Sequence, residues 1–116
     1  MKLSITSDNG GVLLMEASGR ITQGDVSQFD DPMRDLLGDD GFGRRVVLNL
    51  GGVEFVDSSG IGWLIASHKH FRKDGGKLVI HSVRPVVTEI LKILKFHQVL
   101  VIAKNERAAL AAVRRE

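Results

Sequence analysis

The stretch RVVLNLGGVEFVDSSGIG, residues 45–62, contains the strongest indication of how this chain folds. Residues 45–50 form a short apolar run rich in β-branched side chains, which is typical of a strand buried on both faces of a sheet. We expect Gly51 and Gly52 to break this strand, and residues 53–56 to lead the chain to Asp57. A helix should follow as far as the stop signal at residues 74–76, because apolar side chains recur there at helical spacing. The residues of that apolar face are Ile61, Leu64, Ile65, His68 and Phe71.

The part of the chain before this stretch predicts a hairpin and a helix. Two apolar runs at residues 3–5 and 12–17 flank the turn signal at residues 9–11, a pattern that favours two antiparallel strands. Apolar residues then follow a helical period over residues 26–37, but Pro32 interrupts them. Proline lacks an N–H group, so the helix either kinks there or begins afresh, with Asp31 as its N-cap.

The part after residue 76 repeats an alternation of strand and helix. Residues 77–81 and 99–103 are apolar runs of strand length, and helices are indicated after Pro85 and after Asn105. The predicted order is therefore β-β-α-β-α-β-α-β-α. This order predicts an α/β fold, with a mostly parallel sheet, an antiparallel hairpin at one edge and about four helices.

Composition narrows the class of protein. A chain of 116 residues predicts one domain, residues 1–116, and the absence of cysteine excludes a disulfide scaffold. No apolar stretch approaches the roughly 18 residues of a membrane helix, so we expect a cytoplasmic protein with no direct membrane insertion. The net charge is +2, yet residues 1–58 hold 5 basic and 10 acidic side chains and residues 59–116 hold 11 basic and 4 acidic ones. Basic runs are short and there is a single Trp, so nucleic acid is not an expected partner.

Motifs for catalysis are missing. The spacing of glycines matches neither a P-loop nor a dinucleotide fingerprint. The four histidines, His68, His70, His81 and His97, have no metal-ligand spacing, so we predict no metal, no cofactor and no catalytic residue. A nucleotide-binding or hydrolytic protein that uses the glycine-containing helix start at residues 60–62 as an anion site is the alternative from another class.

The segment DSSGIG, residues 57–62, lies where the strand hands over to the helix. Asp57 or Ser58 can cap the free N–H groups there, which is one sufficient reason for both residue types. Gly60 and Gly62 are poor helix formers, so either the backbone stays accessible or something packs closely against it. A phosphate on a serine here would add about −1.5 to −2 charges. The helix dipole favours that charge and Asp57 disfavours it, so a docked partner could be released while the fold persists. Plain capping and a binding switch both remain open at this point.

Residues 46–62 resemble the STAS domain family, and within it the anti-sigma factor antagonists. That family has an apolar strand containing Asp or Asn, a short step, and then Asp-Ser-Ser/Thr-Gly-Leu/Ile-Gly. The resemblance implies a non-enzymatic protein that binds an anti-sigma factor and so releases a sigma factor. It implies that the anti-sigma factor is a serine kinase that switches the complex off by phosphorylating Ser58, with Ser59 as the second candidate, and that a metal-dependent phosphatase reverses this. The partner-binding residues would be Asp57, Ser58, Ser59, Gly60, Ile61, Gly62 and Trp63.

The resemblance leaves alternatives and departures. A STAS domain can also be a sensor or accessory subunit, either of a stressosome-like complex or of a lipid-transport ABC system. Thr22 replaces the family's usual Asp, Pro32 falls within the first helix region, and Lys95 replaces a Gly that relatives place at the end of the third helix. Trp63 has two interpretations: an exposed anchor for the partner, or a side chain packed sideways on a neighbouring helix or loop.

Overall fold

The computed structural model describes residues 1–27 and 30–115 and contains a five-stranded sheet in the order β1-β2-β3-β4-β5. β1 runs antiparallel to β2, and the remaining neighbours pair in parallel. This confirms the predicted α/β fold with a hairpin at one edge. The strands are β1 Lys2–Asn9, β2 Val12–Ile21, β3 Arg45–Val56, β4 Lys77–His81 and β5 Val101–Ala103.

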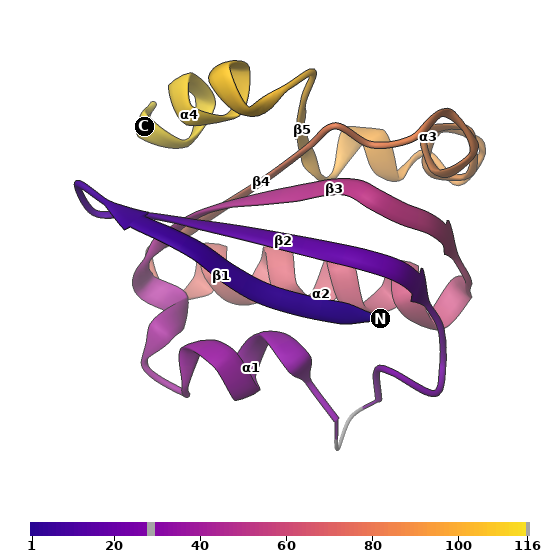
Figure 1. The fold of residues 1–116 in the computed structure, drawn as a ribbon, viewed down its shortest axis with the longest axis horizontal. Helices are drawn as coiled ribbons and strands as arrows, with labels where there is room; N and C mark the ends of the chain where they lie inside the picture. The colour runs from indigo at the N-terminus through magenta and orange to yellow at the C-terminus, as the bar shows by residue number, and fades with distance from the viewer. Residues whose placement is uncertain (28–29, 116) are drawn as a thin grey trace.

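The helices lie on both faces of the sheet (Figure 1). One face carries α1, α2 and α3, whose buried residues join the main hydrophobic core, and the other face carries α4 over a smaller cluster around Val47 and Val79. The helices are α1 Pro32–Leu37, α2 Ser58–Lys73, α3 Pro85–Ile93 and α4 Glu106–Arg114, with the short 3-10 helices η1 Gly41–Gly43 and η2 Phe96–Gln98.

α1 begins at Pro32, so of the two expectations for this segment, a kink or a new helix start, the new start is confirmed. The Asp31 carboxylate accepts hydrogen bonds from the backbone N–H groups of Met33 and Arg34, 3.1 and 3.3 Å away. Proline occupies the first helical position, where its missing N–H group would have had no helical partner in any case. The helix is short and buries Met33 in the main core.

The expectation that Gly51 and Gly52 break the strand was wrong, since β3 runs unbroken from Arg45 to Val56. The glycines mark an irregular register, with shifts in the β2–β3 pairing between Glu16 and Ser18 and between Gly19 and Arg20. A Cβ on Gly52 would lie 3.0 Å from the Ser18 Cβ and 3.2 Å from the Ala17 carbonyl oxygen. The small residue therefore lets the two strands approach closely where the register changes.

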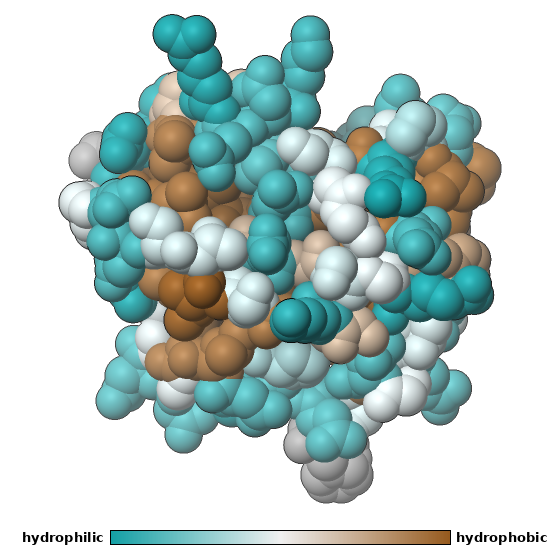
Figure 2. All heavy atoms as spheres, viewed as in Figure 1, coloured by the Kyte–Doolittle hydropathy of each residue, from teal (hydrophilic) through white to brown (hydrophobic). Residues whose placement is uncertain are grey.

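The connection after α3 exposes apolar residues. Val87 and Leu91 of α3 are buried, whereas Leu94 is 48% exposed and Ile93 is 75% exposed. Lys95 adopts the left-handed conformation at φ 61°, so the helix turns sharply here in spite of the lysine. Hydrophobic atoms gather on the surface over α3 (Figure 2).

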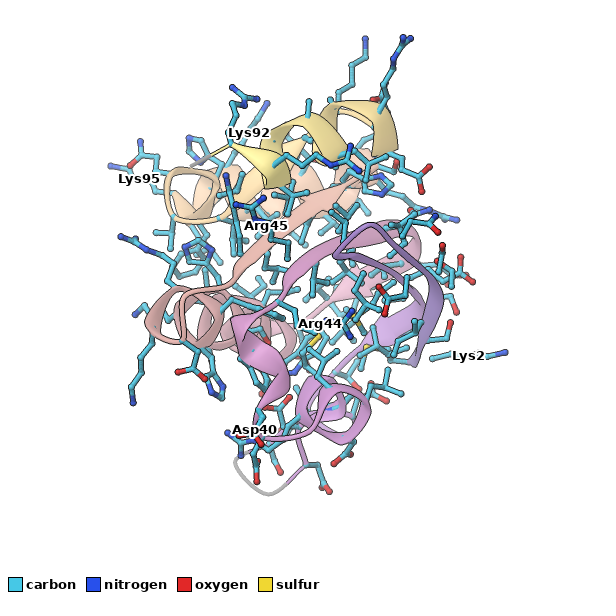
Figure 3. All side chains as sticks on the ribbon, turned by 90° about the vertical axis from the view of Figure 1, so that its left-hand side faces the viewer. Lys2, Asp40, Arg44, Arg45, Lys92 and Lys95 are labelled. Carbon is cyan, nitrogen blue, oxygen red and sulfur yellow. The ribbon has the colours of Figure 1, made fainter. Side chains whose placement is uncertain are left out.

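Charged side chains are spread over the surface. Lys92 in α3 and Lys95 just after it lie at the upper left in Figure 3, and Asp40, which directly precedes η1, lies at the bottom. Between them, the Arg44 guanidinium lies 2.7 Å from the Asp8 carboxylate and ties the start of β3 to the β1–β2 hairpin.

Candidate functional site at the beginning of helix α2

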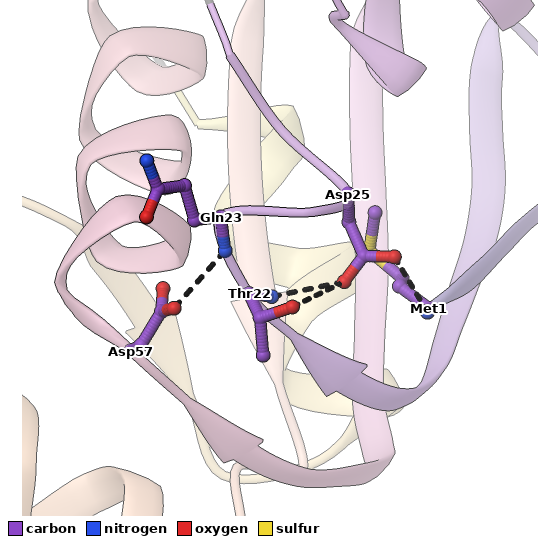
Figure 4. A network of polar contacts seen from close by, with 5 residues as sticks. All are labelled: Met1, Thr22, Gln23, Asp25 and Asp57. Atoms are coloured by element: carbon purple, nitrogen blue, oxygen red, sulfur yellow. Dashed lines mark hydrogen bonds and ion pairs between the residues drawn. The ribbon is translucent and has the colours of Figure 1, made fainter.

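Asp57 fixes the beginning of α2 to the neighbouring loop. One carboxylate oxygen accepts a hydrogen bond from the Gly60 N–H at 2.9 Å, and the other accepts one from the Gln23 N–H at 3.0 Å (Figure 4). The Asp57 N–H in turn donates to the Ile21 carbonyl at 3.1 Å. The predicted cap is thus Asp57 rather than Ser58. Because both of its oxygens are engaged, the carboxylate holds the end of β2 and the start of α2 in one rigid unit.

A second carboxylate stabilises the loop that Asp57 grips. Asp25 accepts hydrogen bonds from the Thr22 N–H at 2.9 Å and from the Thr22 hydroxyl at 3.1 Å. The amino group of Met1 lies 3.0 Å from its other oxygen. The Thr22 N–H and the Met1 amino group lower the pKa of Asp25 below its ordinary value. Thr22 has no carboxylate of its own, but it donates hydrogen bonds to the carboxylate of Asp25, three residues further along the chain.

Ser58 and Ser59 lie on different sides of the first turn of α2. Ser58 is exposed and lines a groove of about 570 Å³ between α2 and the end of α3. Ser59 is half-buried and lines a cavity of about 440 Å³ on the α1 side, next to Asp31 and Trp63. Of the two serines, only Ser58 therefore has an exposed side chain that lines the apolar groove.

The two glycines of the segment have different surroundings. A Cβ on Gly60 would lie 2.5 Å from the Ile21 carbonyl oxygen and 2.7 Å from Val56 Cγ1. Nothing lies within 4 Å of a Cβ on Gly62. Gly60 is therefore required for close packing of α2 on the end of β2. Gly62 lies in open space, so no side chain covers the surface at this position beside Ser58.

The interpretation of Trp63 as an exposed anchor was wrong. Its side chain is only 7% exposed and belongs to the main hydrophobic core. The indole Nε1–H donates to the Asp31 carboxylate at 3.0 Å, so the ring joins α2 to the cap of α1. The helical pattern of α2 alone places Trp63 away from the sheet, but α1 covers that side of the helix and buries it.

The groove beside Ser58 contains two residues that the sequence did not single out for a partner, Leu94 and Phe96. Ile61, Ile65 and Lys69 of α2 line it with them. Leu94 and Phe96 reach it because the left-handed turn at Lys95 reverses the chain after α3. The consecutive apolar pair Ile93 and Leu94 was the available signal, since both cannot face the core from one end of a helix.

No hydrogen bond joins a histidine to Ser58 or Ser59 in residues 1–27 and 30–115. His70 lies 3.3 Å from the Asp74 carboxylate and stacks on Phe42, with ring centroids 3.6 Å apart. The described residues contain no group of three His, Cys, Asp or Glu side chains that could hold a metal ion. None of the described helices is both long and apolar enough to cross a membrane.

Residues 5–109 match the STAS domain family, and the chain belongs to that family. It is 29% identical over 112 residues to BtrV of Bordetella bronchiseptica, which is named as an anti-sigma factor antagonist; the match covers 97% of this chain and 94% of BtrV.

Solved structures share the fold across nearly the whole chain. A Thermotoga maritima protein, TM1081, described as an anti-sigma factor antagonist, superposes with a TM-score of 0.81 at 21% identity, covering 98% of this chain and 94% of that one. The anti-sigma factor antagonist SpoIIAA in its unphosphorylated form gives a TM-score of 0.67 at 15% identity, covering 99% and 100%. The phosphorylated form of Bacillus SpoIIAA gives 0.65 at 15% identity, covering 97% and 100%.

Proposed function

We propose that this protein is an anti-sigma factor antagonist whose binding is switched off by phosphorylation of Ser58. The observation that carries the proposal is the position of Ser58: an exposed hydroxyl on a rigid helix start, at the rim of an apolar groove. The name of BtrV and the existence of a phosphorylated form of SpoIIAA support it. The protein would act in the cytoplasm as a binding protein rather than an enzyme.

The groove supplies the docking surface for the anti-sigma factor. Leu94 lines it and is exposed, Ile93 before it in the chain is exposed as well, and Ile61 and Ile65 line its α2 side. Burial of such side chains by a partner favours the complex, because apolar surface is removed from water. The partner-binding set then consists of Asp57, Ser58, Ile61 and Gly62 together with Leu94 and Phe96, and Trp63 serves the fold.

A phosphate on Ser58 would act on the complex more than on the fold. In the free protein the phosphate remains hydrated, and the amino end of α2 favours an anion by about 0.3–1 kcal/mol. Asp57 opposes it as a like charge one residue away, but both Asp57 oxygens are already engaged and hold the helix start in place. When a partner covers the groove, the dianion must lose water beside apolar side chains and beside Asp57, which costs several kcal/mol unless cations compensate. The complex therefore dissociates while the scaffold stays folded.

A kinase and a phosphatase complete the proposed cycle. The anti-sigma factor is itself the serine kinase, so docking brings the kinase to Ser58 and the product no longer fits the groove. A metal-dependent serine phosphatase would restore the hydroxyl. Ser59 is a poorer acceptor because its side chain is half-buried and faces the α1 side of the helix.

Phosphate mapping and binding measurements test the proposal together. The protein is incubated with a candidate anti-sigma kinase and ATP, and the phosphate is located by mass spectrometry; we expect it on Ser58. Calorimetric titration should show that Ser58→Ala binds the kinase like the parent chain and that Ser58→Asp binds at least about tenfold more weakly, a difference of about 1.4 kcal/mol. Ser59→Ala and Ser59→Asp are the matched controls, since the same charge one residue away points to the α1 side. A phosphate found only outside residues 58–59, or equal binding by Ser58→Asp and Ser58→Ala, would overturn the proposal.

A further inference from the structure

A separate cavity lies at the opposite end of α2 from Ser58. It has a volume of about 490 Å³ and is formed where β3 and β4 begin, where α2 and α4 end, and where the chain enters β5. We call it the basal cavity. Figure 3 faces this end of the molecule, and Arg45 lies there between α4 and α2. Its size falls in the range of sites for small organic molecules, roughly 300–1,000 Å³.

The charged side chains of the basal cavity are all cationic. Arg45, Arg72, Lys77 and Arg115 line it, and no acidic residue of the described ranges 1–27 and 30–115 does. The guanidinium groups of Arg45, Arg72 and Arg115 form no ion pair within the described part of the chain. The Lys77 ammonium is held by the carbonyls of Ala112 and Arg115 at 2.6 and 3.2 Å, which places it at the end of α4. Like charges gathered around one hollow repel one another and favour an anion in it.

A buried imidazole adds a polar group to this cavity. His68 lines it, is only 5% exposed, and forms no hydrogen bond with any residue that the structure describes. Burial lowers the pKa of His68, and the positive charges of Arg72 and Lys69 lower it further. The ring is therefore neutral at pH 7 and keeps one N–H group available to an acceptor. An imidazole that lines a cavity without a protein partner can bond to a ligand there.

The rest of the lining is apolar. Leu78, Val99 and Val101 contribute aliphatic side chains from β4, from the segment before β5 and from β5 itself. Valine and leucine side chains offer no hydrogen bonds, so inorganic phosphate alone would leave this part of the cavity unfilled. The lining thus combines cations for an anionic group with an apolar wall for the body that carries it.

We propose that the basal cavity binds a small organic phosphate. The guanidinium groups of Arg45, Arg72 and Arg115 would hold the phosphate group, with Lys77 behind them. Several cations together match the double negative charge of a phosphate better than the single charge of a carboxylate. His68 would donate one hydrogen bond, and Leu78, Val99 and Val101 would contact the apolar body. The site is distinct from the Ser58 groove, so it does not depend on the function proposed above.

Phenyl phosphate is a suitable probe, because it joins a dianion to an apolar ring. Two-dimensional NMR of the full ¹⁵N-labelled chain should show saturable shifts at residues 45, 68, 72, 77–78 and 99–101, and none at residues 57–62. Phenol and inorganic phosphate should each bind about tenfold more weakly, because each lacks one half of the recognition. Shifts that never saturate, or inorganic phosphate binding as tightly as phenyl phosphate, would overturn the proposal.

Matched variants separate a built site from general attraction to a basic surface. Arg72→Gln should weaken phenyl phosphate binding by about tenfold, since it removes one charge-assisted hydrogen bond to the phosphate. Lys73→Gln removes the same charge from the next residue, which is exposed and does not line the cavity, and should leave the affinity unchanged. Equal losses in the two variants would mean non-specific attraction and would exclude the site. Both positions are exposed, so neither substitution threatens the fold.

Discussion

The residue types at the start of α2 do not by themselves determine what each residue does in the structure. Asp57 could have been a cap, a phosphosite neighbour or both, and its contacts show a cap that also grips the Gln23 N–H across 34 residues of chain. Gly60 and Gly62 look equivalent in the sequence, yet only Gly60 lies against the carbonyl of Ile21. Ser58 and Ser59 are chemically identical and differ only in the side of the helix that they face.

The first residue-scale prediction concerns Asp57. Asp57→Ala removes the acceptor for both Gly60 and Gln23, and the loss of an N-cap alone costs about 0.5–2 kcal/mol. We expect the free energy of unfolding to fall by about 2 kcal/mol in urea denaturation. Asp57→Asn keeps a side-chain oxygen for one of the two bonds and should lose less. Equal stability of Asp57→Ala and the parent chain would contradict the described contacts.

The second residue-scale prediction compares the two glycines. Gly60→Ala forces a methyl group against the Ile21 carbonyl and should destabilise the fold by about 1–3 kcal/mol. Gly62→Ala meets no neighbour and lies inside a helix, where alanine is favoured over glycine by about 1 kcal/mol, so it should stabilise the protein. Denaturation midpoints of the two variants should therefore shift in opposite directions. A stabilised Gly60→Ala would show that α2 can move away from β2.

At the scale of elements, α1 and the end of α3 decide what the start of α2 presents. α1 covers one side of α2 and draws Trp63 into the core through Asp31. The left-handed Lys95 turns the chain so that Leu94 and Phe96 line the other side. The exposed surface beside Ser58 is therefore a groove floored by α2 and walled by the end of α3.

The element-scale prediction tests the link between α1 and α2. Trp63→Phe keeps an aromatic ring in the core but removes the Nε1–H donor to Asp31. Loss of one hydrogen bond to a charged group should cost about 1.5–3 kcal/mol, measured as the free energy of unfolding. Affinity for the proposed anti-sigma factor partner should stay within about twofold, because the buried ring is not part of the proposed docking surface. A loss of affinity larger than the loss of stability would restore Trp63 as a partner anchor.

At the scale of the whole molecule, buried histidines make stability depend on pH. His81 is buried at the end of β4; its Nδ1 lies 2.8 Å from the Ser82 hydroxyl, and its Nε2 has no partner among the described residues. Burial lowers the pKa of His81 below the ordinary value of 6.5, against a smaller opposing effect of Glu106. The pKa of His68 is lowered in the same direction.

The pH prediction follows from these lowered values. Below pH 6.5 the unfolded chain takes up protons that the folded chain does not, so the free energy of unfolding should fall as the pH drops through and below that value. His81→Leu removes one of these groups and should make the fall shallower in denaturation curves at about pH 7.5, 6.5 and 5.5. His97→Gln, which removes a histidine from an exposed position, is the matched control. NMR titration of the His81 ring in the unaltered chain checks the same prediction, and a pKa above 6.5 would contradict it.

Much of this architecture follows from local chemistry. The apolar run before Asn49, the alternation of strands and helices, the restart of α1 at Pro32 and the cap at Asp57 or Ser58 could all be predicted, because periodicity, proline geometry and capping act over a few residues. The unbroken β3 could not, because the pairing with β2 that keeps Gly51 and Gly52 in the strand involves residues 34 positions away. The burial of Trp63 escaped prediction for the same reason, since Asp31 lies 32 positions before it.

The amino-acid sequence by itself determined the order of elements, the family pattern around Ser58 and the division into an acidic and a basic half. Only the tertiary structure decided which serine faces the groove, which glycine is indispensable, and that Arg45, Arg72, Lys77 and Arg115 surround one cavity. The reason is physical: helical and strand periods specify which face of its own element a residue occupies, whereas the neighbour on that face comes from a distant part of the chain through packing.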